Sequence, residues 1–118
     1  RLRGRPPKNL GQRFDIVVWQ KKNKEIKAII EIKIAWDASG LLRDRKKIDK
    51  YIKNKKYVKA GYLLAYTEAK KADTLSERLE SWADKDNLNC NLVGRYINMQ
   101  GDGEWFWAIG LFKLKRND

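Results

Sequence analysis

An acidic and a basic residue, Glu31 and Lys33, stand two positions apart inside a run of isoleucines. Side chains of a strand alternate between the two faces of a sheet, so Glu31 and Lys33 would lie side by side on one face. The isoleucine-rich segment 29–34 is typical of a buried strand. Burial of charged side chains is costly unless they are paired or bind a metal ion. These two residues are therefore the first candidates for chemistry.

Asp15 supplies a second acid within reach of Glu31. Segment 14–19 also has the pattern of a strand, and the polar segment 21–24 is short enough for the turn of a β-hairpin. A turn centred near Asn23 places Asp15 opposite Glu31, with the two Cβ atoms about 4.5–5.5 Å apart. Carboxylates this close raise each other's pKa, and a divalent cation removes the repulsion. Hard oxygen ligands on a rigid sheet suit Mg²⁺ or Mn²⁺.

A surface salt bridge is the alternative interpretation of the same residues, with Lys33 pairing Asp15 or Glu31. Such a pair contributes about 0–1 kcal/mol and implies no activity. The order of the surrounding segments favours chemistry, because the two strands are followed by a basic helix and then by the apolar strand 61–67.

This order resembles the PD-(D/E)XK signature of the restriction-endonuclease-like superfamily, over roughly residues 13–67. The matching residues are Asp15 and, sixteen positions later, Glu31-Ile32-Lys33. The resemblance implies an α/β fold with a mixed β-sheet flanked by helices, and a Mg²⁺- or Mn²⁺-dependent nuclease that hydrolyses DNA phosphodiester bonds. It also implies that Asp15, Glu31 and the backbone carbonyl of Ile32 hold the metal ion, while Lys33 assists the attacking water.

The family core begins with a helix and a strand that precede the strand of the first acid. Residues 1–13 have no periodicity and supply neither element. We expect those elements to be missing from this chain, absent in a reduced variant, or supplied by another chain. The edge of the Asp15 strand is then uncovered, which favours a homodimer or a contact with an additional chain.

The net charge of +12 is concentrated in two segments. Residues 1–13 hold five basic and no acidic residues, and residues 41–60 hold nine basic and two acidic residues. Clustered positive charge attracts polyanions, so DNA is the expected partner. The alternatives are an anionic membrane surface or a charge that serves solubility alone.

A helix is predicted over residues 41–54, with apolar residues on one side and lysines on the others. Asp44 and Lys47 resemble an acidic and basic pair that many family members carry on this helix. A solvated lysine face is the alternative for any single lysine. The candidate nucleic-acid contacts are Arg13, Lys46, Lys47, Lys50 and Lys53.

The rest of the chain completes one domain. We expect a basic irregular arm over residues 1–13 and a nuclease-like domain over 14–118, with a core at 14–67 and a C-terminal helix and β-hairpin at 72–115. The hairpin is rich in aromatic residues, which could stack single-stranded bases but are expected instead to close the core against the helix. Trp36 is likewise expected in the core rather than against a base.

Composition excludes several classes of function. The chain has no histidine and one cysteine, so an internal disulfide, the usual zinc sites and histidine-based catalysis are excluded. No segment has the length and apolarity of a membrane span, and a cytoplasmic or otherwise intracellular location, at the nucleoid or nucleus, is expected. The alternatives to a nuclease are a non-catalytic nucleic-acid-binding module and an assembly domain that pairs through its sheet edge.

Overall fold

The computed structural model describes residues 14–99 and 103–116, so the predicted arm with Arg13 lies outside the described residues. A single mixed β-sheet has the strand order β1-β2-β3-β5-β4. The elements in chain order are β1 (Ile16–Trp19), β2 (Ile26–Ile34), α1 (Ala38–Ile52), β3 (Ala60–Ala69), α2 (Ala72–Ala83), β4 (Cys90–Ile97) and β5 (Phe106–Leu114). The prediction of one α/β domain with a mixed sheet and helices is confirmed.

The predicted hairpin register at the start of the sheet is also confirmed. Strands β1 and β2 are antiparallel, and Ile16 pairs with Ile30. In an antiparallel pair, the residue before Ile16 on one strand lies opposite the residue after Ile30 on the other, so Asp15 lies opposite Glu31. Strand β3 pairs with β2 in parallel through the α1 crossover, and β5 is antiparallel to both β3 and β4.

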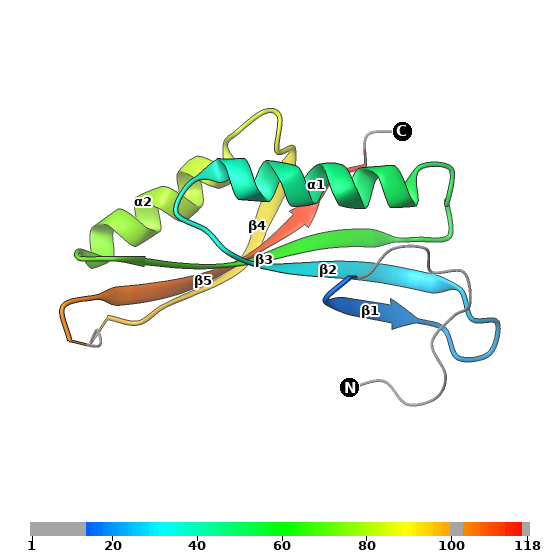
Figure 1. Ribbon diagram of the computed structural model, residues 1–118, viewed down its shortest axis with the longest axis horizontal. Coiled ribbons are helices and arrows are strands. Elements are labelled where there is room, and N and C mark those ends of the chain that lie inside the picture. The colour runs from blue at the N-terminus through cyan, green and yellow to red at the C-terminus, as the bar shows by residue number, and fades with distance from the viewer. Residues whose placement is uncertain (1–13, 100–102, 117–118) are drawn as a thin grey trace.

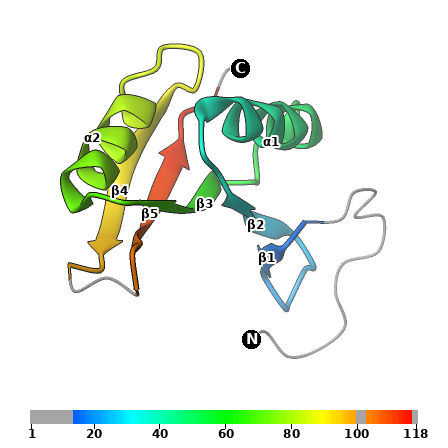
Figure 2. The same cartoon turned by 60° about the vertical axis from the view of Figure 1, so that its left-hand side comes forward.

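Both helices of the described residues pack on the same face of the sheet, and neither of them covers the opposite face (Figure 1, Figure 2). The core between them includes Ile29, Leu63 and Phe112, each without measurable exposure. Two glycines allow the helices to approach closely. A β-carbon at Gly61 would lie 2.8 Å from Cγ2 of Ile48 on α1, and one at Gly110 would lie 2.9 Å from Cδ2 of Leu79 on α2.

Helix α1 is fixed at its N-terminal end and at its middle. Asp37 caps the first turn by accepting a hydrogen bond from the backbone N–H of Ser39 at 2.9 Å. Arg45 is buried and donates hydrogen bonds to the carbonyls of Leu88, Asn89 and Lys115. The helix therefore holds a fixed position over β2. Neither helix of the described residues is long and apolar enough to cross a membrane.

The isoleucine face of β2 is not buried, contrary to the prediction. Ile29 and Glu31 point into the helix-covered layer, whereas Ile32 is 47% and Ile34 is 68% exposed on the opposite face. The alternation along the strand was predicted, but the charged face is the one that α1 covers. The physical reason is that Glu31 has a cationic partner on the helix.

The aromatic residues of the C-terminal hairpin divide between the two faces of the sheet. Phe112 packs near Trp82 of α2, as predicted for core closure. Tyr96 and Trp107 contact each other on the face without helices, so that prediction is wrong for them. Trp36 is 55% exposed, and the prediction that it joins the core is also wrong.

Candidate active site

Three elements meet at the residues that the sequence singled out. Asp15 stands immediately before β1, Glu31 and Lys33 lie on the helix-covered face of β2, and Asp44 and Lys47 reach this face from α1. The site lies near the edge of the sheet, because β1 is an edge strand. The structure thus brings together Asp15, Glu31 and Lys33, as well as the Asp44 and Lys47 of the helix.

Asp15 is bound to the main chain of β2. Its Oδ2 accepts a hydrogen bond from the backbone N–H of Ile32 at 2.7 Å. The edge strand therefore holds its carboxylate against the residue between Glu31 and Lys33. This contact places the backbone of Ile32 at the site through its N–H group. The carbonyl of Ile32, which the resemblance assigns to the metal ion, stays a prediction.

The carboxyl groups of Asp15 and Glu31 influence each other, and their pKa values move in opposite directions. The hydrogen bond with Glu31, followed by that from Ile32, holds the pKa of the exposed Asp15 below its usual value. Burial raises the pKa of Glu31, and Asp15 adds to the rise while Lys47 opposes it. Two carboxyl groups this close need a proton or a cation between them to remain together.

Lys47 supplies a positive charge to the buried acid. Its Nζ lies 2.5 Å from Oε1 of Glu31, whose side chain is only 6% exposed. The same ammonium group lies 4.8 Å from the ring centre of Phe14, and Phe14 contacts Tyr51 edge to face. The Phe14 ring, which itself packs against Tyr51, therefore limits the positions of Lys47 without neutralising it.

Lys33 is paired with a different acid. Its Nζ lies 3.5 Å from Oδ1 of Asp44, and its side chain is 30% exposed. The first turn of α1 lies against its methylene groups, since a β-carbon at Gly40 would be 3.5 Å from Cδ of Lys33. The predicted surface pair of Lys33 with Asp15 or Glu31 is absent from the described ion pairs. Lys33 is instead held beside the two acids by the helix.

The donors at this site fit a hard divalent cation. Two adjacent carboxylates and a main chain offer oxygen ligands, which Mg²⁺ and Mn²⁺ prefer. Within residues 14–99 and 103–116, no group of three or more acidic, cysteine or histidine side chains gathers to hold a metal ion. Such a cation would therefore need water or phosphate oxygens to complete its ligands, as is usual for Mg²⁺.

The four lysines proposed to contact nucleic acid differ in exposure. Lys46, Lys50 and the C-cap residue Lys53 are exposed, whereas Lys47 turns inward to Glu31. The exposed three extend the positive charge from the site along the helix. Arg13 lies outside the described residues.

Sequence reasoning missed which lysine pairs with which acid. No partner was predicted for Asp44 or Lys47, and each pairs with a residue of β2. Their spacing of three residues puts both on the face above the strand, which was the available signal. The ring contacts of Phe14 and Tyr51 had no signal in the sequence, because they depend on how α1 crosses β1.

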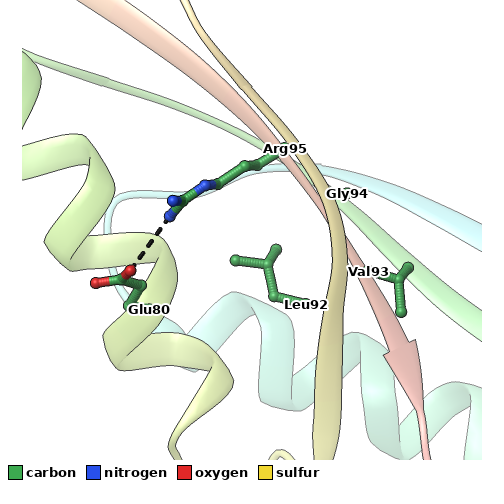
Figure 3. Close-up of a pocket in the computed structure, with 5 residues that line it drawn as sticks. All are labelled: Glu80, Leu92, Val93, Gly94 and Arg95. Carbon is green, nitrogen blue, oxygen red and sulfur yellow. Dashed lines mark hydrogen bonds and ion pairs between the residues drawn. The ribbon is translucent and has the colours of Figure 1, made fainter.

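A hollow between α2 and β4 is separate from this site (Figure 3). Arg95 and Glu80 point toward each other across it and form an ion pair of 3.3 Å, with Leu92 beneath them. Its charged groups neutralise each other, so it offers no unsatisfied charge to a ligand.

Comparisons with protein-family models, with curated proteins and with solved structures found no match for this chain.

Proposed function

We propose that the chain is a metal-dependent nuclease of the restriction-endonuclease-like superfamily that hydrolyses DNA phosphodiester bonds. The observation that supports this best is the position of Asp15, whose carboxylate is bound to the backbone N–H of Ile32, between Glu31 and Lys33 on β2. Two acids this close are costly unless a cation or a proton lies between them, and a metal site would account for their placement.

Asp15, Glu31 and the main chain of Ile32 are the groups that would hold Mg²⁺ or Mn²⁺. When bound, such an ion acts as a Lewis acid on a phosphoryl oxygen and lowers the pKa of its water. Lys33 donates a hydrogen bond to the attacking water or to a phosphoryl oxygen and balances the developing negative charge. Asp44 keeps the Lys33 ammonium group beside the acids.

The helix supplies the electrostatic attraction for the substrate. Lys46 and Lys50 are exposed on α1 and Lys53 is exposed at its C-cap, so they belong to the helix that also carries Asp44 and Lys47. Lysines in such a row contact the phosphates of one strand without reading its bases. The proposal therefore concerns the chemistry and the polyanion, not the sequence that is cut.

The test is cleavage of supercoiled and of single-stranded DNA with Mg²⁺ or Mn²⁺, comparing the wild type with Lys33→Ala. Cleavage that needs the metal and is lost in the variant would support the proposal. The matched control is Lys27→Ala on the same strand, since its side chain is 31% exposed against 30% for Lys33. Equal loss in both variants would contradict a specific role for Lys33.

A non-catalytic nucleic-acid-binding module is the second candidate. It is favoured by the ion pairs of Lys47 with Glu31 and of Lys33 with Asp44, which already neutralise the acids. Such a module would bind DNA with an affinity that falls steeply with salt and is indifferent to Mg²⁺. Binding without cleavage, and without any effect of the metal on affinity, would select this alternative.

A further inference from the structure

The face of the sheet without helices carries apolar side chains on all five strands, and we call it the open face. The pairing registers align its side chains in rows that run across the strands. One row is Ile32, Leu64 and Leu111. The next row is Ile34, Tyr66, Ile109 and Tyr96. Such a continuous surface differs from the scattered apolar residues of an ordinary monomer.

Several of these side chains are far more exposed than a folded core allows. Ile34 is 68%, Tyr96 60% and Ile32 47% exposed. Trp36 and Trp105 contact each other edge to face beyond the end of β2 and are 55% and 40% exposed. Burying these residues against a partner would remove a large apolar area from water.

The open face is nearly uncharged on a chain whose net charge is +12. On β3 and β5, Glu68 and Lys113 are its charged members, and the carboxylate of Glu68 accepts a hydrogen bond from Tyr66. A nucleic acid would be drawn to the lysines of α1 on the other side of the sheet. Depletion of charge with enrichment of aromatic residues is instead typical of the core of a protein interface.

From these observations we infer that the open face is the interface of a homodimer, formed by two copies packed face to face about a two-fold axis that runs across the strands. Five strands about 4.8 Å apart and about eight residues long cover roughly 600 Å² per copy. Two copies then bury about 1,200 Å², the lower limit for a stable specific interface. A two-fold axis brings the same face of both copies into contact, so a single apolar surface supplies both halves of the interface.

The positions of the two charges fit this axis. Lys113 pairs with Tyr62, so it lies six residues, or about 20 Å, from Glu68 along the strands. A two-fold axis across the strands exchanges the two ends of the face, and therefore brings Glu68 of one copy to Lys113 of the other. It also sets the leucine row of one copy over the tyrosine row of the other. This inference does not depend on the proposed nuclease activity.

The first experiment is analytical ultracentrifugation of the full chain in 0.5 M salt without nucleic acid. We expect a dimer whose dissociation constant rises about 30-fold or more in Ile34→Glu. Ile34 is mostly exposed, so circular dichroism and the urea midpoint of the variant monomer should match the wild type. The control is Tyr57→Glu, which changes a residue 38% exposed in the turn after α1 and should leave the dimer intact. A wild type that stays monomeric at 100 µM overturns the inference.

A charge exchange then tests the orientation of the axis. Glu68→Lys and Lys113→Glu should each weaken the dimer by opposing like charges, and the double variant should restore it. Failure of the double variant to recover would overturn the proposed axis. A monomeric wild type whose Ile34→Glu variant loses affinity for single-stranded DNA would overturn the dimer and identify the open face as a surface for stacking bases.

Discussion

The Lys47 ammonium group lies 2.5 Å from a carboxylate oxygen of Glu31, so a lysine of α1 neutralises the buried acid of β2. This ion pair connects the stability of the domain with its proposed chemistry. The same contact that lets Glu31 remain ionised in the core also places a cation beside the proposed metal ligands.

Lys47→Met should destabilise the domain more at neutral than at acidic pH. Without Lys47, the buried Glu31 is left unpaired and its already raised pKa rises further. A group with a raised pKa in the folded state loses its stabilising contribution as the pH rises through that pKa. We expect a loss of about 1–3 kcal/mol at pH 7.5 and a smaller one at pH 4.5, measured by urea unfolding. The double variant Glu31→Gln/Lys47→Met should lose this pH dependence, and equal destabilisation of Lys47→Met at both pH values would contradict the argument.

The affinity for Mn²⁺ should rise with pH over a range that begins above pH 4.5. Burial raises the pKa of Glu31 above its ordinary value of 4.5, so a proton competes with the cation for this carboxylate. The pKa of Asp15 is lowered, so Asp15 is already ionised over the same range. Isothermal titration calorimetry from pH 4.5 to 7.5 measures the effect. Glu31→Gln should bind weakly and without this pH dependence, whereas an affinity of the wild type that is constant over the range would count against Glu31 as a ligand.

Asp44→Asn should slow cleavage about tenfold while leaving DNA affinity nearly unchanged. Asp44 acts through Lys33 as a positioning residue, because its carboxylate lies 3.5 Å from the Lys33 ammonium group. Single-turnover rates and binding constants should both be measured, because loss of a residue that only positions Lys33 lowers the rate and leaves the affinity nearly unchanged. Asp44→Glu should restore part of the rate. Asp49→Asn is the control on the same helix, where Asp49 pairs with Arg45 at 3.2 Å, and a similar slowing there would indicate a general effect on α1.

Replacing Lys46, Lys50 and Lys53 together by glutamine should reduce the salt dependence of DNA binding. Each phosphate contact contributes about 0.9 to the slope of log affinity against log salt for duplex DNA, so the slope should fall by about 2.7. All three residues are exposed, and the thermal midpoint should hardly change. Fluorescence anisotropy between 50 and 300 mM salt measures the slope. Glutamine at Lys21, Lys22 and Lys85 removes the same charge elsewhere, and an equal change of slope there would mean that total charge, not α1, governs binding.

The register of the β1–β2 hairpin could be predicted because strand alternation and a short turn leave few ways to pair the strands. Ile16 opposite Ile30, and hence Asp15 opposite Glu31, follows from the position of Asn23 alone. The face that each helix covers could not be predicted in the same way. Strand β2 has isoleucines on both faces, so hydrophobicity does not decide between them, and the charge on Glu31 argues for the wrong face.

What decides the face of β2 is a contact distant in sequence, the ion pair of Glu31 with Lys47 sixteen residues later. A periodicity argument treats each segment separately and cannot weigh such a pair. The same limit explains the aromatic residues of the hairpin. Tyr96 and Trp107 alternate correctly with Phe112, but only the packing of α2 beside α1 determines which set is covered.

The close contact of α1 with Gly61 determines how far the helix lies from the sheet, and therefore how far its side chains extend toward the site. Ile48 of α1 rests 2.8 Å from where a β-carbon would be, so the hydrogen atoms of Gly61 define the distance between helix and sheet. Asp44 and Lys47 belong to that same helix, so a β-carbon at residue 61 would move both of them away from the sheet together. A residue with no side chain, distant from the acids in the chain, thus controls how far two charged side chains reach. A substitution at residue 61 would therefore shift Asp44 and Lys47 together relative to the acids of the site, without replacing either residue.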